Sequence, residues 1–108
     1  MTSDEFARLQ GLSVALAGNS VLLPVAVAIA ERGEAGPVST PIVNQLLGGR
    51  VPTNRISKDL ARLHRLGALT ELPYPGRPHP RIYDVTDGPF WTFVRDWALD
   101  PRVHLADG

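Results

Sequence analysis

The stretch TNRISKDLARLHRLGAL, residues 53–69, determines the fold that we expect for this chain. Its large aliphatic residues recur at the spacing of one helical face, which predicts a helix over residues 54–66. The apolar stripe consists of Ile56, Leu60, Leu63 and Leu66. The opposite face carries long or hydrogen-bonding side chains, namely Asn54, Arg55, Lys58, Arg62 and Arg65. Such a face suits a groove of DNA but also plain solvent, so the flanking segments must decide between the two.

A shorter helix is expected just before this one. Ser39 or Thr40 can cap it, and Pro41 fits its first turn, where a missing N–H is tolerated. Its apolar face consists of Ile42, Val43, Leu46 and Leu47. The pair Gly48 and Gly49 favours the left-handed conformation with which helices end. The two helices should therefore be joined by a tight turn.

A β-hairpin is expected after the long helix, which Thr53 can cap and Gly67 ends. Its strands cover residues 68–72 and 81–85, and the connecting loop 73–80 is rich in proline. Helix, turn, helix and hairpin in this order make a winged helix-turn-helix. The predicted fold class is thus mainly α with a small β-hairpin, with about five helices in all.

The remaining segments complete a single domain over residues 1–108. N-terminal helices are expected within residues 1–37, at 3–17 (capped by Ser3) and 21–32, before the helix-turn-helix and wing at 38–87. A C-terminal helix is expected within residues 88–100, and its Trp91 and Trp97 can pack in the core, pack across a two-fold interface or line a small-molecule pocket. The first helix has a rough stripe of Phe6, Leu9, Leu12 (or Val14) and Leu16. That stripe can cover its own core or a second subunit, whereas residues 21–32 are apolar nearly all round and should be buried on several sides.

Two runs resemble winged-helix regulators of the ArsR and MarR type. The run ISKDLARLHRLGAL, residues 56–69, is similar to their recognition helix and the step that leads into the wing. The run RIYDVT, residues 81–86, is similar to their returning wing strand. The resemblance covers residues 38–87 and implies a homodimeric bacterial transcriptional regulator that binds double-stranded DNA. The chain lacks the cysteines of the ArsR type, so metal sensing is not implied.

The charge distribution favours the same function. The net charge is zero, but residues 50–82 hold seven basic and two acidic residues, a net charge of +5. Residues 1–49 carry −2 and residues 83–108 carry −3. A positive belt confined to the expected recognition helix and wing fits a DNA-binding protein, because backbone phosphates provide most of the affinity.

The expected DNA-binding residues are Arg50, Thr53, Asn54, Arg55, Ser57, Lys58, Arg62, Arg77, His79 and Arg81. The side-chain geometry of Asn54 suits adenine, and that of Arg55 and Lys58 suits guanine. We expect the phosphate contacts to come from Thr53, Ser57, Arg62 and, from the turn, Arg50. In the wing, Arg77 and His79 reach the minor groove or phosphates, or are simply solvated. Arg65 is left out because its place near the helix end takes it away from the groove.

Catalysis and cofactor binding are not expected. The chain has no cysteine, and its three histidines lie on separate segments without the short spacing of metal sites. The longest apolar stretch is about ten residues and contains Pro24, too short for a membrane span, and the N-terminus does not resemble a signal peptide. We therefore expect a cytoplasmic protein that is not an enzyme, has no cofactor or metal, and has no effector site that its residues identify. Two alternatives stay open: a plasmid or phage accessory factor for replication, partition or transfer, and a winged-helix protein-interaction module.

Overall fold

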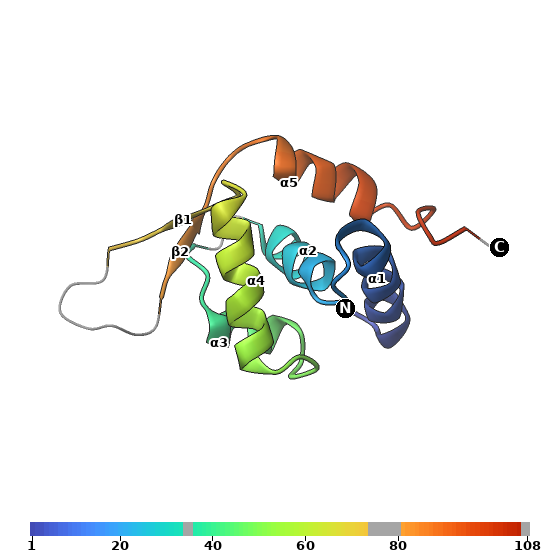
Figure 1. Ribbon diagram of the computed structural model, residues 1–108, viewed down its shortest axis with the longest axis horizontal. Coiled ribbons are helices and arrows are strands. Elements are labelled where there is room, and N and C mark those ends of the chain that lie inside the picture. Colours follow the sequence, from blue (N-terminus) through green and yellow to red (C-terminus); the bar gives the residue numbers. More distant parts are fainter. Residues whose placement is uncertain (34–35, 74–80, 107–108) are drawn as a thin grey trace.

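Helix α2 (Leu22–Arg32) lies at the centre of the molecule because it is apolar on every side. In this computed structural model, which describes residues 1–33, 36–73 and 81–106, each residue of α2 from Leu22 to Ile29 is buried. Figure 1 shows α2 between α1 (Ser3–Ala17) and α4 (Thr53–Arg65), and η1 (Val94–Ala98) also packs on it. The expectation that residues 21–32 are buried on several sides is confirmed.

The junction between α1 and α2 is held by side chains that accept main-chain hydrogen bonds. The Oδ1 atom of Asn19 accepts the N–H groups of Val21 and Leu22, at 2.7 and 3.2 Å, and so caps α2. The hydroxyl of Ser13, buried in α1, accepts the N–H of Leu23 at 3.0 Å. These bonds satisfy donors that the first turn of a helix leaves free.

Helix α1 matches residues 3–17, but two details of its expected pattern are wrong. Its capping residue is Thr2, whose hydroxyl accepts the N–H of Glu5, and not Ser3. The buried face passes through Leu9, Leu12 and Ser13. Val14 falls beside that face and Leu16 lies in the last turn, and both are more than half exposed.

The predicted tight turn between α3 (Thr40–Leu46) and α4 is confirmed. Gly48 and Gly49 have φ values of +66° and +75°, the left-handed region that favours glycine. The side-chain amide of Asn44 donates to the carbonyl of Val51 at 3.1 Å and ties α3 to the turn. Pro52 occupies the cap position of α4 and Thr53 is already its first helical residue, so the expected cap at Thr53 is wrong.

The apolar stripe of α4 is confirmed for three of its four members. Ile56, Leu60 and Leu63 are buried, whereas Leu66 is 62% exposed. The helix ends at Arg65, and Gly67, with φ of +80°, turns the chain away before Leu66 can join the face. The expectation that Leu66 packs in the core is therefore wrong.

The hairpin consists of β1 (Leu69–Glu71) and β2 (Tyr83–Val85), which pair antiparallel with Leu69 opposite Val85. Both strands are shorter than the expected 68–72 and 81–85. Val38, ahead of α3, adds a pairing that the sequence did not predict: its N–H and carbonyl bond with those of Tyr83 at 2.8 and 2.9 Å. The hairpin projects from one end of the molecule (Figure 1).

The expected C-terminal helix is divided into α5 (Pro89–Phe93) and the π-helical segment η1. Trp91 is buried and its indole N–H donates to the carbonyl of Ala68 at 2.9 Å, so this tryptophan packs in the core. Trp97 stacks on Phe93 with ring centroids 5.2 Å apart. The structure is thus mainly helical with a two-stranded antiparallel sheet.

Candidate nucleic-acid interface

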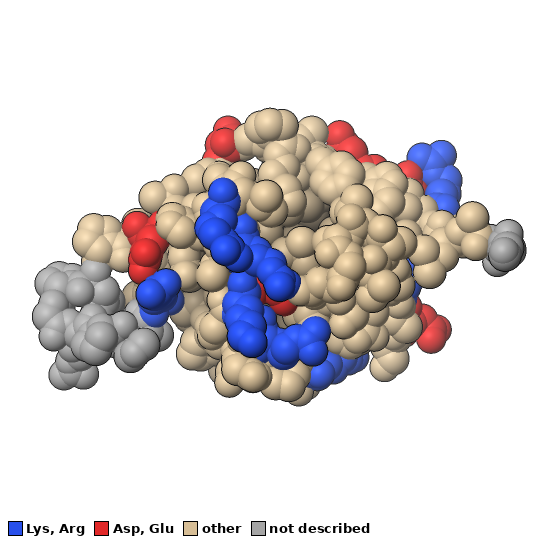
Figure 2. Space-filling model, viewed as in Figure 1, with Lys and Arg blue, Asp and Glu red and all other residues tan. Residues whose placement is uncertain are grey.

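Helix α4 presents a polar outward face. With about 3.6 residues per turn, the positions opposite its buried stripe are Asn54, Lys58, Ala61 and Arg65. Asn54, Lys58 and Arg65 are exposed. Figure 2 shows Lys and Arg side chains gathered in a band over α4, on the face that it shares with the hairpin. Arg65, left out of the expected set, belongs to this outward face.

One flank of α4 is cationic. A hollow of about 440 Å³ separates it from the α1–α2 junction. The hollow is lined from the α4 side by Arg55, Lys58, Asp59 and Arg62, and from the junction by Asn19 and Ser20. Three of the expected DNA-binding residues therefore converge on one concave site, which we call the cationic flank.

The other flank carries mostly neutral hydrogen-bonding groups. A groove of about 580 Å³ runs between α3, α4 and β2, and we call it the neutral flank. It is lined by Thr40, Pro41, Thr53, Asn54, Ser57, Ala61, Arg81 and Tyr83. The hydroxyls of Ser57 and Thr40 lie 2.8 Å apart and share a hydrogen bond. Arg81 lies at the edge of the groove, with its Nε 3.7 Å from a carboxylate oxygen of Glu71.

Asp59, the one acidic residue of α4, is turned inward and only 1% exposed. Its Oδ1 accepts hydrogen bonds from the amide of Asn19 at 3.1 Å and from Nη1 of Arg62 at 3.0 Å. Its Oδ2 is buried and has no hydrogen-bond partner within the described residues. Burial raises the pKa of this carboxyl, and the charge of Arg62 opposes that rise only in part. The acidic side chain therefore faces the junction and not the outward surface.

Three of the expected DNA-binding residues are not placed beside α4 by the structure: Arg50, Arg77 and His79. Arg50 donates from Nη1 to the carbonyl of Met1 at 3.1 Å, and its guanidinium lies 5.6 Å from the ring centroid of Phe6. It thus packs on the start of α1 and lines neither flank of α4. Arg77 and His79 lie outside the described residues.

Several residues of the interface were missed by the sequence analysis. The sequence predicts Asn19 only as part of a break and cap between two helices, and Thr40 only as a helix cap, because nothing in their local pattern points to α4. Nothing in the sequence pattern distinguishes Ala61 or Tyr83 from other helix and strand positions. Each joins the site through contacts between segments that are distant in the chain, such as the pairing of Val38 with Tyr83.

Other kinds of site find no support in the described part of the chain. Residues 1–33, 36–73 and 81–106 contain no group of three His, Asp or Glu side chains placed to hold a metal ion. Within the same ranges, no helix has both the length and the apolar composition needed to cross a membrane. The ring of His64 is bonded through Nδ1 to the carbonyl of Leu69 at 2.9 Å.

No protein-family model, curated protein or solved structure matches the chain.

Proposed function

We propose that this protein is a sequence-specific double-stranded-DNA-binding protein, acting as a homodimeric bacterial transcriptional regulator in the cytoplasm. In this proposal α3, the turn, α4 and the hairpin form a winged helix-turn-helix whose recognition helix is α4. One observation carries the proposal: the outward face and one flank of α4 are basic, and its single acidic residue is turned inward. A helix with this distribution can approach phosphates without an exposed opposing charge.

The two flanks of α4 favour a division of contacts. Arg55 shares the cationic flank with Arg62, so we assign both to backbone phosphates. Asn54 and Ser57 share the neutral flank, so we assign both to base edges. This assignment exchanges the roles that the sequence alone favoured for Arg55 and Ser57.

Two residues in the middle of the outward face complete the proposed contacts. Lys58 lines the cationic flank but also lies opposite the buried stripe, where a lysine can reach guanine. Ala61 is small, and a small side chain lets a helix approach the floor of the major groove and contact a thymine methyl. Arg81 would support the hairpin on the adjacent backbone.

The homodimer is part of this proposal. Leu16 on α1, and Phe93 beside Trp97 near the C-terminal end, are exposed apolar groups of the kind that subunit interfaces cover. Two copies related by a two-fold axis would read half-sites about one helical turn apart, about 34–36 Å, so the bound site should be a pseudopalindrome. Analytical ultracentrifugation tests the oligomeric state directly.

The decisive experiment is selection of bound duplexes from a random library, followed by titration of the selected site at several salt concentrations. We expect the logarithm of the association constant to fall linearly with the logarithm of the salt concentration. Arg55→Ala should weaken binding to all duplexes and reduce the salt slope by about 1, whereas Asn54→Ala should relax specificity at one base pair at a cost of about 1–3 kcal/mol. Arg102→Ala, which removes a charge in the C-terminal tail, is the matched control.

The outcomes separate the alternatives. If no duplex is enriched, or if binding is insensitive to salt, the DNA proposal is wrong, and a protein-interaction module becomes the better hypothesis. If a site is enriched, its positions on the genome distinguish a promoter regulator from an accessory factor for replication, partition or transfer.

A further inference from the structure

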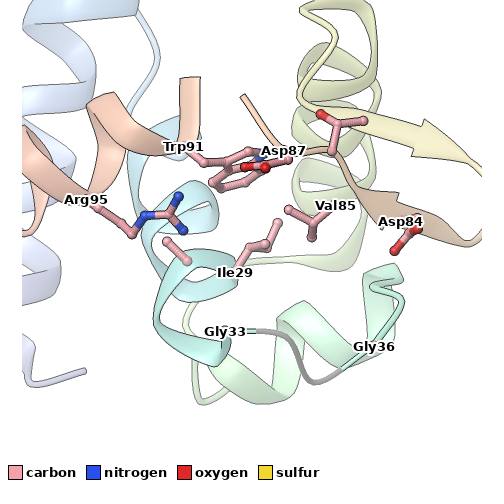
Figure 3. A pocket seen from close by; sticks show the side chains of 10 residues that line it. Ile29, Gly33, Gly36, Asp84, Val85, Asp87, Trp91 and Arg95 are labelled. Carbon is pink, nitrogen blue, oxygen red and sulfur yellow. The ribbon is translucent and has the colours of Figure 1, made fainter. Parts of the chain in front are cut away.

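A third cavity lies on the other side of the hairpin base, away from both flanks of α4. It is open to solvent and is bordered by the C-terminal end of α2, by β2 with the residues that follow it, and by α5 with η1 (Figure 3). Its volume is about 370 Å³. Sites for small molecules occupy roughly 300–1,000 Å³, so the space suits a compact ligand.

The floor of this cavity is apolar and firmly held. Ile29 and Trp91 are buried, and Val85 is partly buried beside them. The indole of Trp91 is fixed by its hydrogen bond to the carbonyl of Ala68 and by an edge-to-face contact with Phe90, at 5.1 Å between ring centroids. The apolar surface open to a ligand is therefore that of Ala30 and Val85, which pack against this rigid core.

Three charged side chains stand around this floor. Arg95 comes from η1, Asp84 from β2, and Asp87 from the turn between β2 and α5. Figure 3 shows Arg95 on one side of the cavity and Asp84 on the other, with the apolar side chains between them. None of the three side chains has a hydrogen-bond or ion-pair partner within residues 1–33, 36–73 and 81–106.

We propose that this cavity binds a small zwitterion with an apolar body, of the class of a free α-amino acid with an aromatic or large aliphatic side chain. The guanidinium of Arg95 pairs with the carboxylate of the ligand, and Asp87 accepts hydrogen bonds from its ammonium group. The side chain of the ligand lies on the partly buried Ala30 and Val85. A ligand with only one charge would leave either Arg95 or the aspartate without an ion-pair partner, so the ligand must carry both a carboxylate and an ammonium group.

This site is independent of the proposed DNA contacts. The residues that carry it are absent from both flanks of α4 and from its outward face. Failure of ligand binding therefore leaves the DNA proposal standing, and failure of DNA binding leaves this one standing.

The test is titration of the protein with L-phenylalanine, L-leucine and L-tryptophan, followed by isothermal calorimetry and by two-dimensional NMR. We expect saturable binding of at least one of the three, with a shift of the indole N–H resonance of Trp91 larger than that of Trp97. For the amino acid that binds, its C-terminal amide and its N-acetyl derivative each lack one of the two charges. Each derivative should bind about tenfold more weakly or worse, because each loses charge-assisted hydrogen bonds.

Protein variants locate the site. Arg95→Gln and Asp87→Asn should each weaken binding by about tenfold, whereas Arg102→Gln and Asp96→Asn, matched in charge but outside the cavity, should leave it unchanged. Circular dichroism verifies that each variant is folded. The proposal is overturned if no amino acid binds at millimolar concentration, if both derivatives bind as well as the parent, or if Arg95→Gln and Asp87→Asn bind as well as the unmodified protein.

Discussion

Replacing Asp59 with asparagine should change how the stability of the protein depends on pH. Asp59 is almost completely buried, and burial raises the pKa of its carboxyl above the ordinary value of 3.8. For such an acid the folded protein holds the proton more tightly than the unfolded chain does. The free energy of unfolding therefore falls as the pH rises from about 3.8 to the folded pKa, and the loss is complete above that pKa.

The pH dependence that Asp59 contributes is limited, because this carboxyl binds only one proton. One titrating group changes the free energy of unfolding by at most about 1.4 kcal/mol per pH unit. The asparagine in Asp59→Asn has nearly the same shape and keeps an oxygen that can accept from Asn19 and Arg62. It removes the buried charge but weakens these two bonds, so we expect a net change within about 1 kcal/mol at neutral pH. Asp59→Leu removes the acceptor itself and should cost about 1–3 kcal/mol.

The assay is urea unfolding of the protein and of Asp59→Asn at a series of pH values, followed by circular dichroism. Subtracting the two curves cancels the contributions of other carboxyls, such as that of Asp100, whose pKa is lowered to about 2 by its hydrogen bonds to Arg102. The stability of the variant relative to the parent should increase with pH across the stated window and then level off. The opposite slope would mean that Asp59 is stabilised as a carboxylate, and would refute the argument from burial.

Three other substitutions test the packing. Arg8→Met should lower the free energy of unfolding by about 2–3 kcal/mol in urea unfolding, because the guanidinium of Arg8 donates at 2.6 Å to main-chain carbonyls at the end of η1 and in the following tail. Trp91→Phe should cost about 1–3 kcal/mol by the same measurement, because the smaller ring leaves a void in the core and the carbonyl of Ala68 keeps only the N–H of Thr86 as donor. A variant as stable as the parent would argue against this packing. Gly67→Ala should cost about 1–2 kcal/mol, because its φ of +80° strains any residue that has a Cβ, even though open space surrounds the site. The cost should be seen as a lower midpoint of thermal unfolding. Gly67→Asn should cost less, because asparagine tolerates the left-handed conformation better.

The helices were the most predictable part of the fold. Glycines at 18, 48, 49 and 67 mark helix ends, and each has a positive φ in the structure. Because these punctuating residues act locally, the bounds of α1, α2 and α4 were each predicted to within one residue. The pairing of Val38 with β2 was not predictable, since it joins segments 45 residues apart and Val38 carries no strand pattern of its own.

The inner face of α4 shows where periodicity fails. The pattern counts residues by their polarity, so it extends the apolar stripe to Leu66 and gives no sign that Asp59 is buried. In the structure the helix ends before Leu66, and Asp59 lies on the buried side between Ile56 and Leu63. A carboxylate can occupy that position because Asn19 and Arg62 satisfy one of its oxygens. Arg62 lies three residues further along the same helix, so its spacing already allowed this pair, whereas Asn19 becomes a partner only when the α1–α2 junction is placed against α4.

The same contact explains why the candidate site was predicted as a set of residues but not as a surface. The sequence shows which side chains lie on α4, whereas the two flanks are distinguished only by what packs beside them: the α1–α2 junction on one side, and α3 with β2 on the other. Arg62 donates to Asp59, so the charge of Arg62 is partly neutralised within the protein. Arg55 and Lys58 make no ion pair in the described residues. On the cationic flank, Arg55 and Lys58 should therefore provide more of the attraction for phosphate than Arg62 does. This order depends on contacts in the folded protein, and counting charges along the chain cannot give it.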